Sequence, residues 1–163
     1  MTARILVAGL GNVFLGDDGF GVAVAERLAA RPLPNDVRVI DLGIRGLDLA
    51  YELLEGYEAV ILIDALPRGG APGTLYVVEP EIAPHDDAST GLADAHALDP
   101  ATVLRLVRSL GGAMPRLRIV GCEPSTDDFA MGLSPAVAAA ADPAAALVES
   151  LIVELREGAI RHA

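Results

Sequence analysis

Four side chains in this sequence could bind a cation. Asp17 and Asp18 are adjacent and end a glycine-rich loop that follows the apolar run starting at Ile5, and Asp64 ends a second apolar run. His96 precedes a helical pattern. Two carboxylates and one imidazole form a donor set that suits a divalent first-row metal ion, without choosing among nickel, zinc, manganese and iron. Asp18, Asp64 and His96 are therefore the candidate ligands of a metal site.

The acidic pair also indicates what the glycine-rich loop does not bind. A bare helix N-terminus attracts the phosphates of a dinucleotide, whereas two acids at a helix start repel them. The loop is expected to face a cation. Ordinary roles remain open: Asp18 could cap the following helix, and Asp64 could accept backbone N–H groups at a strand end. Asp17 is expected to be the solvated neighbour, although the sequence does not settle which acid of the pair turns inward.

The other histidines compete weakly with His96. A lone loop histidine is more often an ordinary polar residue than a ligand. His85 lies in the polar patch Pro84-His-Asp-Asp87, which is expected to be solvated, and His162 is next to the C-terminus, where chains fray. Cys122 closes an apolar run and is expected to be a buried small hydrophobe. No HExxH, GxSxG or plausible Cys–His arrangement is present, so the familiar hydrolase nucleophiles are missing.

The composition excludes several classes of protein. The chain has 163 residues and is 52% hydrophobic, which suits a single globular domain over residues 1–163. Its net charge of -11 opposes binding to nucleic acid or to an anionic membrane surface. It contains no lysine, so a Walker-type phosphate loop has no central residue. No apolar run approaches the roughly 18 residues of a membrane span, and a monomer in the cytoplasm is expected.

Short β-branched runs alternate with helical patterns, which is typical of a parallel sheet covered by helices. We predict an α/β fold, a three-layer αβα sandwich with a mostly parallel, twisted sheet of about five strands, as in phosphorylase/hydrolase-like proteins. The strands are expected at residues 4–10, 37–42, 59–65, 74–79 and 116–122. Helices are expected from the acidic pair to before Pro32, at residues 47–54, at 101–110, and from Pro135 to Gly158 with Pro143 kinking or splitting the last one.

In such a sheet, ligands collect beyond the carboxyl ends of the strands, where Asp18 and Asp64 are both expected to project. A carboxylate at the tip of a strand as apolar as Ala-Val-Ile-Leu-Ile63 is costly unless it is paired or bound to a metal. Residues from about 80 to 98 show no clear period, and a loop of that length is usually functional or mobile.

Several short motifs occur together in an order and spacing that resemble the hydrogenase maturation proteases. They are Gly9-Leu-Gly-Asn12 with Asp17-Asp-Gly-Phe-Gly21, Ile63-Asp-Ala65, Pro72-Gly-Thr74, His96 before Leu98, and Gly121-Cys-Glu-Pro124 followed by Gly132-Leu-Ser-Pro135. These endopeptidases trim the large-subunit precursor of nickel–iron hydrogenases. The resemblance runs nearly end to end, and the motifs are specific only in combination.

The resemblance implies that Asp18, Asp64 and His96 form the metal-binding and catalytic site. It also implies that the ion is nickel carried by the hydrogenase precursor, so that nickel is part of the substrate. Family members often have glutamate where this chain has Asp18, and the shorter side chain shifts the oxygen by about one methylene. The family's Asp-Gly-Gly-Thr loop is replaced by Asp41-Leu-Gly-Ile-Arg-Gly46, which leaves its substrate contacts open.

Three other interpretations of the sequence compete with this resemblance. A nicotinamide-binding module would need a third glycine where Phe14 stands. Peptidyl-tRNA hydrolases share an apolar run ending in Gly-Leu-Gly-Asn, but Val13 follows here where that family has proline, and the net charge suits tRNA poorly. A non-catalytic nickel-binding assembly chaperone is the strongest alternative, because the same three ligands could deliver nickel without cutting.

Overall fold

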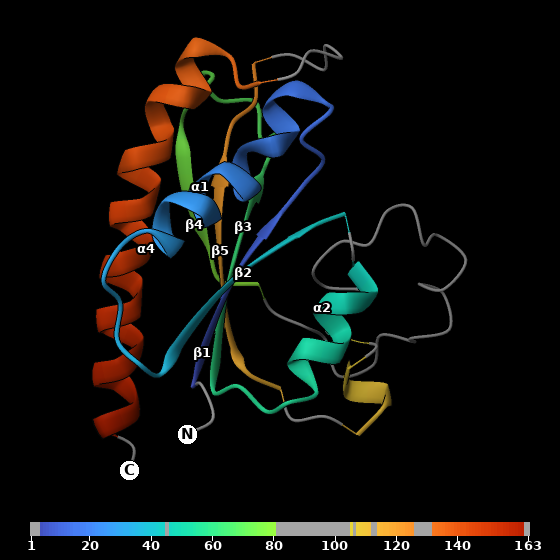
Figure 1. Cartoon of the computed structure of the whole chain (residues 1–163), viewed down its shortest axis with the longest axis vertical. Coiled ribbons are helices and arrows are strands. Elements are labelled where there is room, and N and C mark those ends of the chain that lie inside the picture. Colours follow the sequence, from blue (N-terminus) through green and yellow to red (C-terminus); the bar gives the residue numbers. More distant parts are fainter. Residues whose placement is uncertain are drawn as a thin grey trace.

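The computed structural model describes residues 4–44, 46–80, 105, 107–111, 114–125 and 132–161. Five strands form one sheet in the order β2-β1-β3-β5-β4, with β4 antiparallel to β5 and the other pairs parallel. The strands are β1 Ile5–Leu10, β2 Val37–Gly43, β3 Ala59–Ala65, β4 Leu75–Val78 and β5 Arg116–Cys122. Each agrees with its predicted range to within one residue at either end. The mostly parallel α/β sheet is confirmed (Figure 1).

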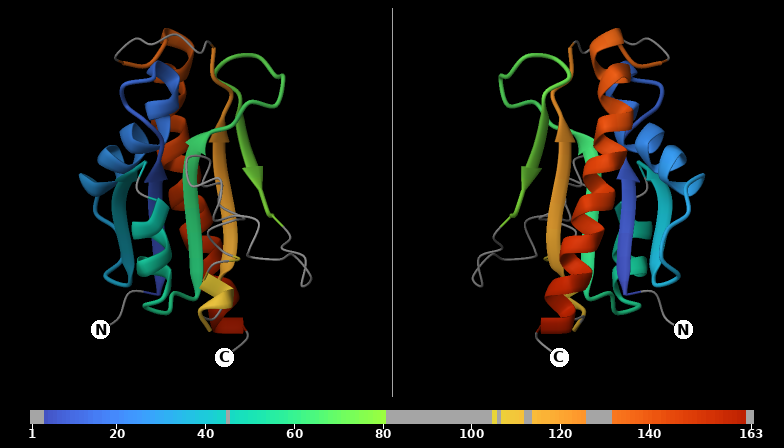
Figure 2. Two further views of the ribbon diagram at one scale, coloured as in Figure 1. Left: turned by 90° about the vertical axis from the view of Figure 1, so that its right-hand side faces the viewer. Right: turned by 90° about the vertical axis from the view of Figure 1, so that its left-hand side faces the viewer.

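Helices cover both faces of this sheet. Helices α1 (Phe20–Ala29) and α4 (Pro135–Arg161) lie on one face, and α2 (Gly46–Leu53) lies on the other (Figures 1 and 2). A short 3₁₀ helix, η1 (Gly16–Gly19), precedes α1. Of the predicted helix at residues 101–110, the described residues 105 and 107–109 are helical. The three-layer arrangement is confirmed.

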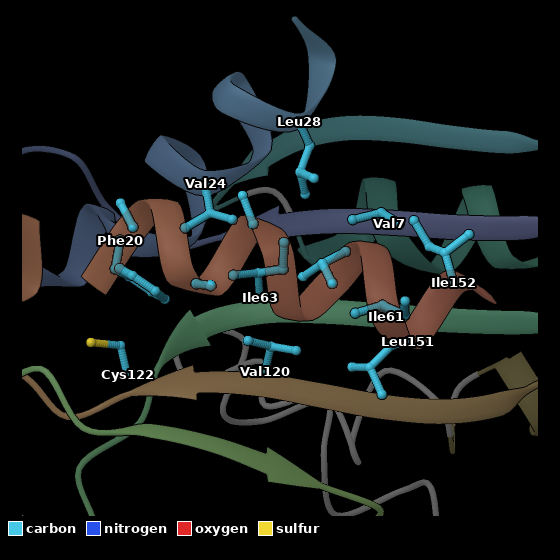
Figure 3. Packing of buried hydrophobic residues seen from close by; sticks show 14 of the residues in the cluster. Val7, Phe20, Val24, Leu28, Ile61, Ile63, Val120, Cys122, Leu151 and Ile152 are labelled. Atoms are coloured by element: carbon cyan, nitrogen blue, oxygen red, sulfur yellow. The ribbon is translucent and has the colours of Figure 1, made fainter. Parts of the chain in front are cut away.

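The core is divided by the sheet. All six residues of β1 are buried, as expected for a strand covered on both faces. The larger apolar cluster fills the space between the sheet and helices α1 and α4, and includes Val7, Phe20, Ile61 and Ile152 (Figure 3). A second cluster lies under α2 and includes Leu6, Leu49, Leu53, Val60 and Leu62. Burial of these side chains fixes the strands and thereby the edge at which they end.

Two glycines allow α1 to touch the sheet backbone to backbone. A Cβ on Gly21 would overlap the carbonyl oxygens of Ile63 and Leu10, and a Cβ on Gly9 would lie 2.7 Å from the Cβ of Ala25. Contacts below 3.0 Å are not found for real Cβ atoms. The start of α1 can therefore approach the ends of β1 and β3 only because these positions have no side chain. This approach brings η1, which carries both acids, over the carboxyl edge.

Helix α4 begins at Pro135, as predicted, but it ends later than predicted. It runs unbroken through Pro143 and Gly158 to Arg161, so the stop at Gly158 and the split at Pro143 are wrong. Gly158 has a packing role instead, because a Cβ there would lie 2.8 Å from Nη1 of Arg116. The Nη2 atom of Arg116 donates to the carbonyl oxygen of Leu155 at 2.8 Å. The glycine makes room for an arginine that binds the last turns of the helix.

By length and composition alone, residues Pro135–Gly158 of α4 could cross a membrane, with a mean hydropathy of 1.6. From the sequence, no segment is expected to be long and apolar enough to cross a membrane, but this helix meets those criteria. In the fold, one side of this helix packs against the sheet and α1, where Val137, Ala141, Val148 and Ile152 are at most 2% exposed. A helix that packs in a protein core can meet the same length and composition criteria as a membrane span, and α4 packs in this way.

Candidate functional site

The parallel register brings Asp18 and Asp64 to the same place. Gly9 of β1 is level with Ile63 of β3, so Asp64, the next residue of β3, lies beside the end of β1, where the glycine-rich loop begins. Gly11 has a φ of +123°, and a Cβ on it would overlap the carbonyl oxygen of Asp18 and lie 3.3 Å from Oδ1 of Asp64. A glycine in this conformation therefore lies between the two acids, and the predicted convergence of Asp18 and Asp64 is present in the structure.

Backbone N–H groups orient both carboxylates. The N–H of Asn12 donates to Oδ2 of Asp18 at 2.7 Å, and the N–H of Ala65 donates to Oδ1 of Asp64 at 2.8 Å. Asp18 is not a helix cap, because the cap positions of η1 and α1 are Leu15 and Gly19 and neither helix start has a side-chain cap hydrogen bond. The backbone-acceptor role considered for Asp64 is present and involves Oδ1, and among the described residues no hydrogen bond to Oδ2 is seen.

The charge of Asp18 disfavours the ionisation of Asp64. Burial, and secondly the charge of Asp18, raise the pKa of Asp64 from 3.8 to about 7, while the N–H of Ala65 lowers it. Within the described residues, no salt bridge reaches either carboxylate. A divalent cation between them would remove the repulsion and replace the lost hydration. Two partly buried oxygen donors of this kind fit a divalent metal ion.

The third predicted ligand, His96, lies outside the described residues, as do His85 and His162. Among the residues that are described, no three His, Cys, Asp or Glu side chains form a group that could hold a metal ion. The described part of the site is therefore an acid pair, and a third ligand would have to come from elsewhere. Ligation by His96 stays a prediction.

Asp17 is buried, which makes its predicted solvent exposure wrong. It is 3% exposed and accepts four hydrogen bonds. Ser125 donates its N–H and its hydroxyl at 2.9 Å each, and Ser134 donates its N–H at 2.7 Å and its hydroxyl at 2.8 Å. Burial alone would raise the pKa of Asp17, but these bonds outweigh it and the pKa lies below its ordinary value. Asp17 anchors the segment after β5 and the start of α4 to the loop that carries Asp18.

Glu123 has a comparable role that was not predicted from the sequence. It follows β5, is 5% exposed, and its Oε1 accepts from the N–H groups of Arg68 and Gly70 and from the hydroxyl of Tyr76, each at 2.8 Å. Burial acts to raise the pKa of Glu123, but the donors reverse this and lower it. Glu123 therefore holds the loop after β3, directly beyond Asp64. The sequence did indicate this residue, because Glu123 is another acid that directly follows an apolar strand.

Cys122 is buried in the core, as predicted, with its side chain 0% exposed. Burial, followed by the charges of Asp17 and Glu123, raises the pKa of this thiol to about 11. A thiol that stays protonated is a poor nucleophile. Asp41, which was expected in a loop, lies within β2, where it is exposed and lines a groove between β2 and α2, together with Asp48, Tyr51 and Glu55.

Gly43, the last residue of β2, has a φ of +55°, which explains a glycine at this position. Arg45 lies outside the described residues.

The fold and the site together define a three-layer α/β protein with an acid pair at the carboxyl edge of its sheet. Residues 22–151 match the family described as hydrogenase maturation protease. Among curated relatives, the hydrogenase 2 maturation protease of Escherichia coli strain K12 is 32% identical over 158 residues, which cover 96% of this chain and 93% of that protein.

The hydrogenase expression/formation protein HupD of Rhodobacter capsulatus is 37% identical over 141 residues, and the match covers 85% of this chain and 66% of HupD. Solved structures with a similar fold also include hydrogenase maturation peptidases. The hydrogenase-maturating endopeptidase HybD from Escherichia coli has a TM-score of 0.73 at 31% identity, with 95% of this chain and 93% of HybD covered.

The hydrogenase 2 maturation peptidase from a Thaumarchaeota archaeon has a TM-score of 0.70 at 34% identity, with coverage of 91% and 97%. The chain belongs to the hydrogenase maturation protease family, and it is a peptidase. The resemblance seen in the sequence is confirmed, and the family is neither a dinucleotide-binding module nor a peptidyl-tRNA hydrolase.

Proposed function

We propose that this peptidase removes the C-terminal extension of a nickel–iron hydrogenase large-subunit precursor after nickel has been inserted, and that it recognises the bound nickel. Asp18, Asp64 and His96 are the proposed nickel ligands and catalytic residues. The observation that supports the proposal most is the acid pair, in which burial and the charge of Asp18 bring the pKa of Asp64 to about 7. A divalent ion that arrives with the substrate would offset the repulsion between the two carboxylates and so favour their charged forms.

In this proposal the nickel ion is part of the substrate. Ligation by this chain would hold the C-terminal extension beside the ion, whose positive charge polarises the carbonyl of the peptide bond to be cut or activates a water. Hydrolysis adds one water across the bond, so that the carbonyl carbon gains the oxygen and the leaving amine gains a proton. The buried, protonated thiol of Cys122 takes no part in this scheme. The reaction is proposed to take place in the cytoplasm with the protein as a monomer.

The test compares nickel-loaded and nickel-free precursor incubated with the purified protein, and weighs the large subunit by mass spectrometry. We expect shortening of the nickel-loaded precursor only, and loss of cleavage by at least about a hundredfold in Asp18→Asn, Asp64→Asn and His96→Ala. His85→Ala is the matched control for the histidine and is expected to cleave normally. Equal cleavage of both precursors, or cleavage that survives His96→Ala, would contradict nickel recognition.

The same experiment addresses the alternative of a non-catalytic nickel-binding chaperone. A chaperone would change the nickel content of the large subunit and leave its C-terminus intact. A large subunit that keeps its full mass after incubation with the wild-type protein and nickel would therefore favour the chaperone.

A further inference from the structure

Exposed apolar side chains gather at the carboxyl edge of the sheet, next to the acid pair. Val13 is 41% exposed, Phe14 is 65% exposed and Ile44 is 73% exposed. We call these three residues the rim patch. Val13 and Phe14 belong to the glycine-rich loop after β1, and Ile44 directly follows β2, so the three come from neighbouring strands. Large apolar residues that protrude beside a functional site commonly contact a partner.

The turn that presents Val13 and Phe14 does not need apolar residues. The N–H of Leu15 donates to the carbonyl oxygen of Asn12 at 3.1 Å, and the N–H of Phe14 donates to Oδ1 of the Asn12 side chain at 2.9 Å. Asn12 therefore shapes the turn, and Val13 and Phe14 occupy its two central positions. Glycine, proline, aspartate, asparagine and serine dominate such positions. A valine and a phenylalanine at the tip of the turn bring no folding advantage that the structure shows.

The rim patch is tied to the acid pair by main-chain hydrogen bonds. The N–H of Gly11 donates to the carbonyl oxygen of Gly43 at 2.9 Å, which holds Ile44 against the start of the glycine-rich loop. The N–H of Asn12, the residue that shapes the turn, also donates to Oδ2 of Asp18 at 2.7 Å. A molecule that touches the rim patch thus contacts the same loop that orients an acid of the site.

We propose that the rim patch is the docking surface for an apolar segment of the hydrogenase precursor next to its cleavage point. This inference rests on the proposed function and adds a specificity determinant to it. The occupant follows from position, because the patch is continuous through Asn12 with the site that must hold the peptide bond to be cut. An exposed aromatic side chain on a well-defined turn loses little conformational freedom when it is buried by a partner, which makes Phe14 the main anchor.

The test measures initial cleavage rates against precursor concentration, using nickel-loaded precursor and purified full-length protein. Phe14→Ser and Ile44→Ser are each expected to raise KM roughly tenfold, while kcat at saturation changes by less than about twofold, because docking strengthens binding without entering the chemistry. Val153→Ser is the matched control, since Val153 is 55% exposed on α4 and is part of neither the patch nor the acid pair. Its KM is expected to stay unchanged.

Equal KM values in Phe14→Ser and Val153→Ser would overturn the inference, as would a loss confined to kcat. A second copy of this chain is the competing occupant. Sedimentation equilibrium that shows a wild-type dimer converted to a monomer by Phe14→Ser would assign the patch to self-association and overturn precursor docking.

Binding measurements separate this inference from the proposed function. Biolayer interferometry with immobilised precursor, loaded and nickel-free, gives a Kd that does not depend on cleavage. A wild-type protein that binds precursor but never shortens it overturns the proposed function, while a roughly tenfold weaker Kd for Phe14→Ser still supports the patch. Equal Kd values for the two proteins overturn the patch even when cleavage is normal, and a wild type that binds neither precursor overturns both.

Discussion

Replacing Asp64 by asparagine should stabilise the isolated protein at alkaline pH. Asparagine has the same size and keeps an Oδ1 that can accept the N–H of Ala65, but it cannot ionise. The folded protein holds the proton of Asp64 up to a pH of about 7, whereas the unfolded chain releases it near the ordinary value of 3.8. Between these values the folded state binds more protons, so the free energy of unfolding falls as the pH rises.

The size of this effect follows from the two pKa values of Asp64. The difference between about 7 and 3.8 is about 3 pH units, and each unit corresponds to about 1.36 kcal/mol. The ionised carboxylate should therefore destabilise the wild-type protein by about 4 kcal/mol at pH 8, but by only about 2 kcal/mol at pH 5. The free-energy advantage of Asp64→Asn over the wild type should be about 2 to 3 kcal/mol larger at pH 8 than at pH 5.

Urea unfolding of both proteins at pH 5 and pH 8 measures this difference directly. Asp142→Asn controls for the removal of one negative charge, because the side chain of Asp142 is 75% exposed on α4. The reasoning is refuted if Asp64→Asn and the wild type differ by the same free energy at both pH values, or if the wild type becomes more stable from pH 5 to pH 8 relative to Asp64→Asn.

In the proposed mechanism, the proton on Asp64 competes with the nickel ion for the same carboxylate. If ligation requires the ionised carboxylate, kcat/KM for the nickel-loaded precursor should be about tenfold lower at pH 6 than at pH 8, since about one tenth of a group with a pKa near 7 is ionised at pH 6. Cleavage rates measured across this range check the expectation, and a flat profile would contradict it.

Three further substitutions test the supporting structure. Asp17→Asn should lower the free energy of unfolding at pH 7 by about 2 to 4 kcal/mol, because four donors from Ser125 and Ser134 lose a charged acceptor. Since the folded pKa of Asp17 is lowered, this contribution is present above its ordinary value and disappears as the pH falls through the folded value, which urea unfolding below pH 4 will show. Gly21→Ala should cost about 3 kcal/mol or more in thermal unfolding, because its Cβ overlaps backbone oxygens. Cys122→Ala should retain cleavage to within about twofold, and a large loss of kcat would revive the thiol as a catalyst.

The strands and the position of the acid pair could be predicted because they depend on local patterns. Apolar β-branched runs that end in an acid identify both the strand and the edge where the acid lies. In a parallel sheet the carboxyl ends of the strands lie at one edge, so Asp18 and Asp64 could be expected at the same edge. That β1 and β3 are neighbours, which brings the two acids together, is known only from the structure.

What could not be predicted depends on contacts between distant segments. The burial of Asp17 depends on Ser125 and Ser134, which lie more than a hundred residues away along the chain. Likewise, Gly158 reads as a helix stop until Arg116 of β5 is known to lie against it. A residue type carries the same local signal in both roles, and only the tertiary partner decides between them.

The adjacent acids Asp17 and Asp18 have different roles, because Asp17 holds the loop in place and Asp18 belongs to the acid pair. In η1 the two carboxylates have different surroundings. Asp17 accepts four hydrogen bonds from Ser125 and Ser134. By contrast, Asp18 lies close enough to Asp64 for its charge to raise the pKa of Asp64. The satisfied carboxylate, Asp17, has a lowered pKa and holds the loop in place. The acid pair has one backbone donor identified on each member, and its mutual repulsion is relieved by either a proton or a cation. If the proposed nickel ligation is correct, a precursor that brings the ion must displace that proton, and its affinity should then depend on how rigidly Asp17 holds the loop that carries Asp18.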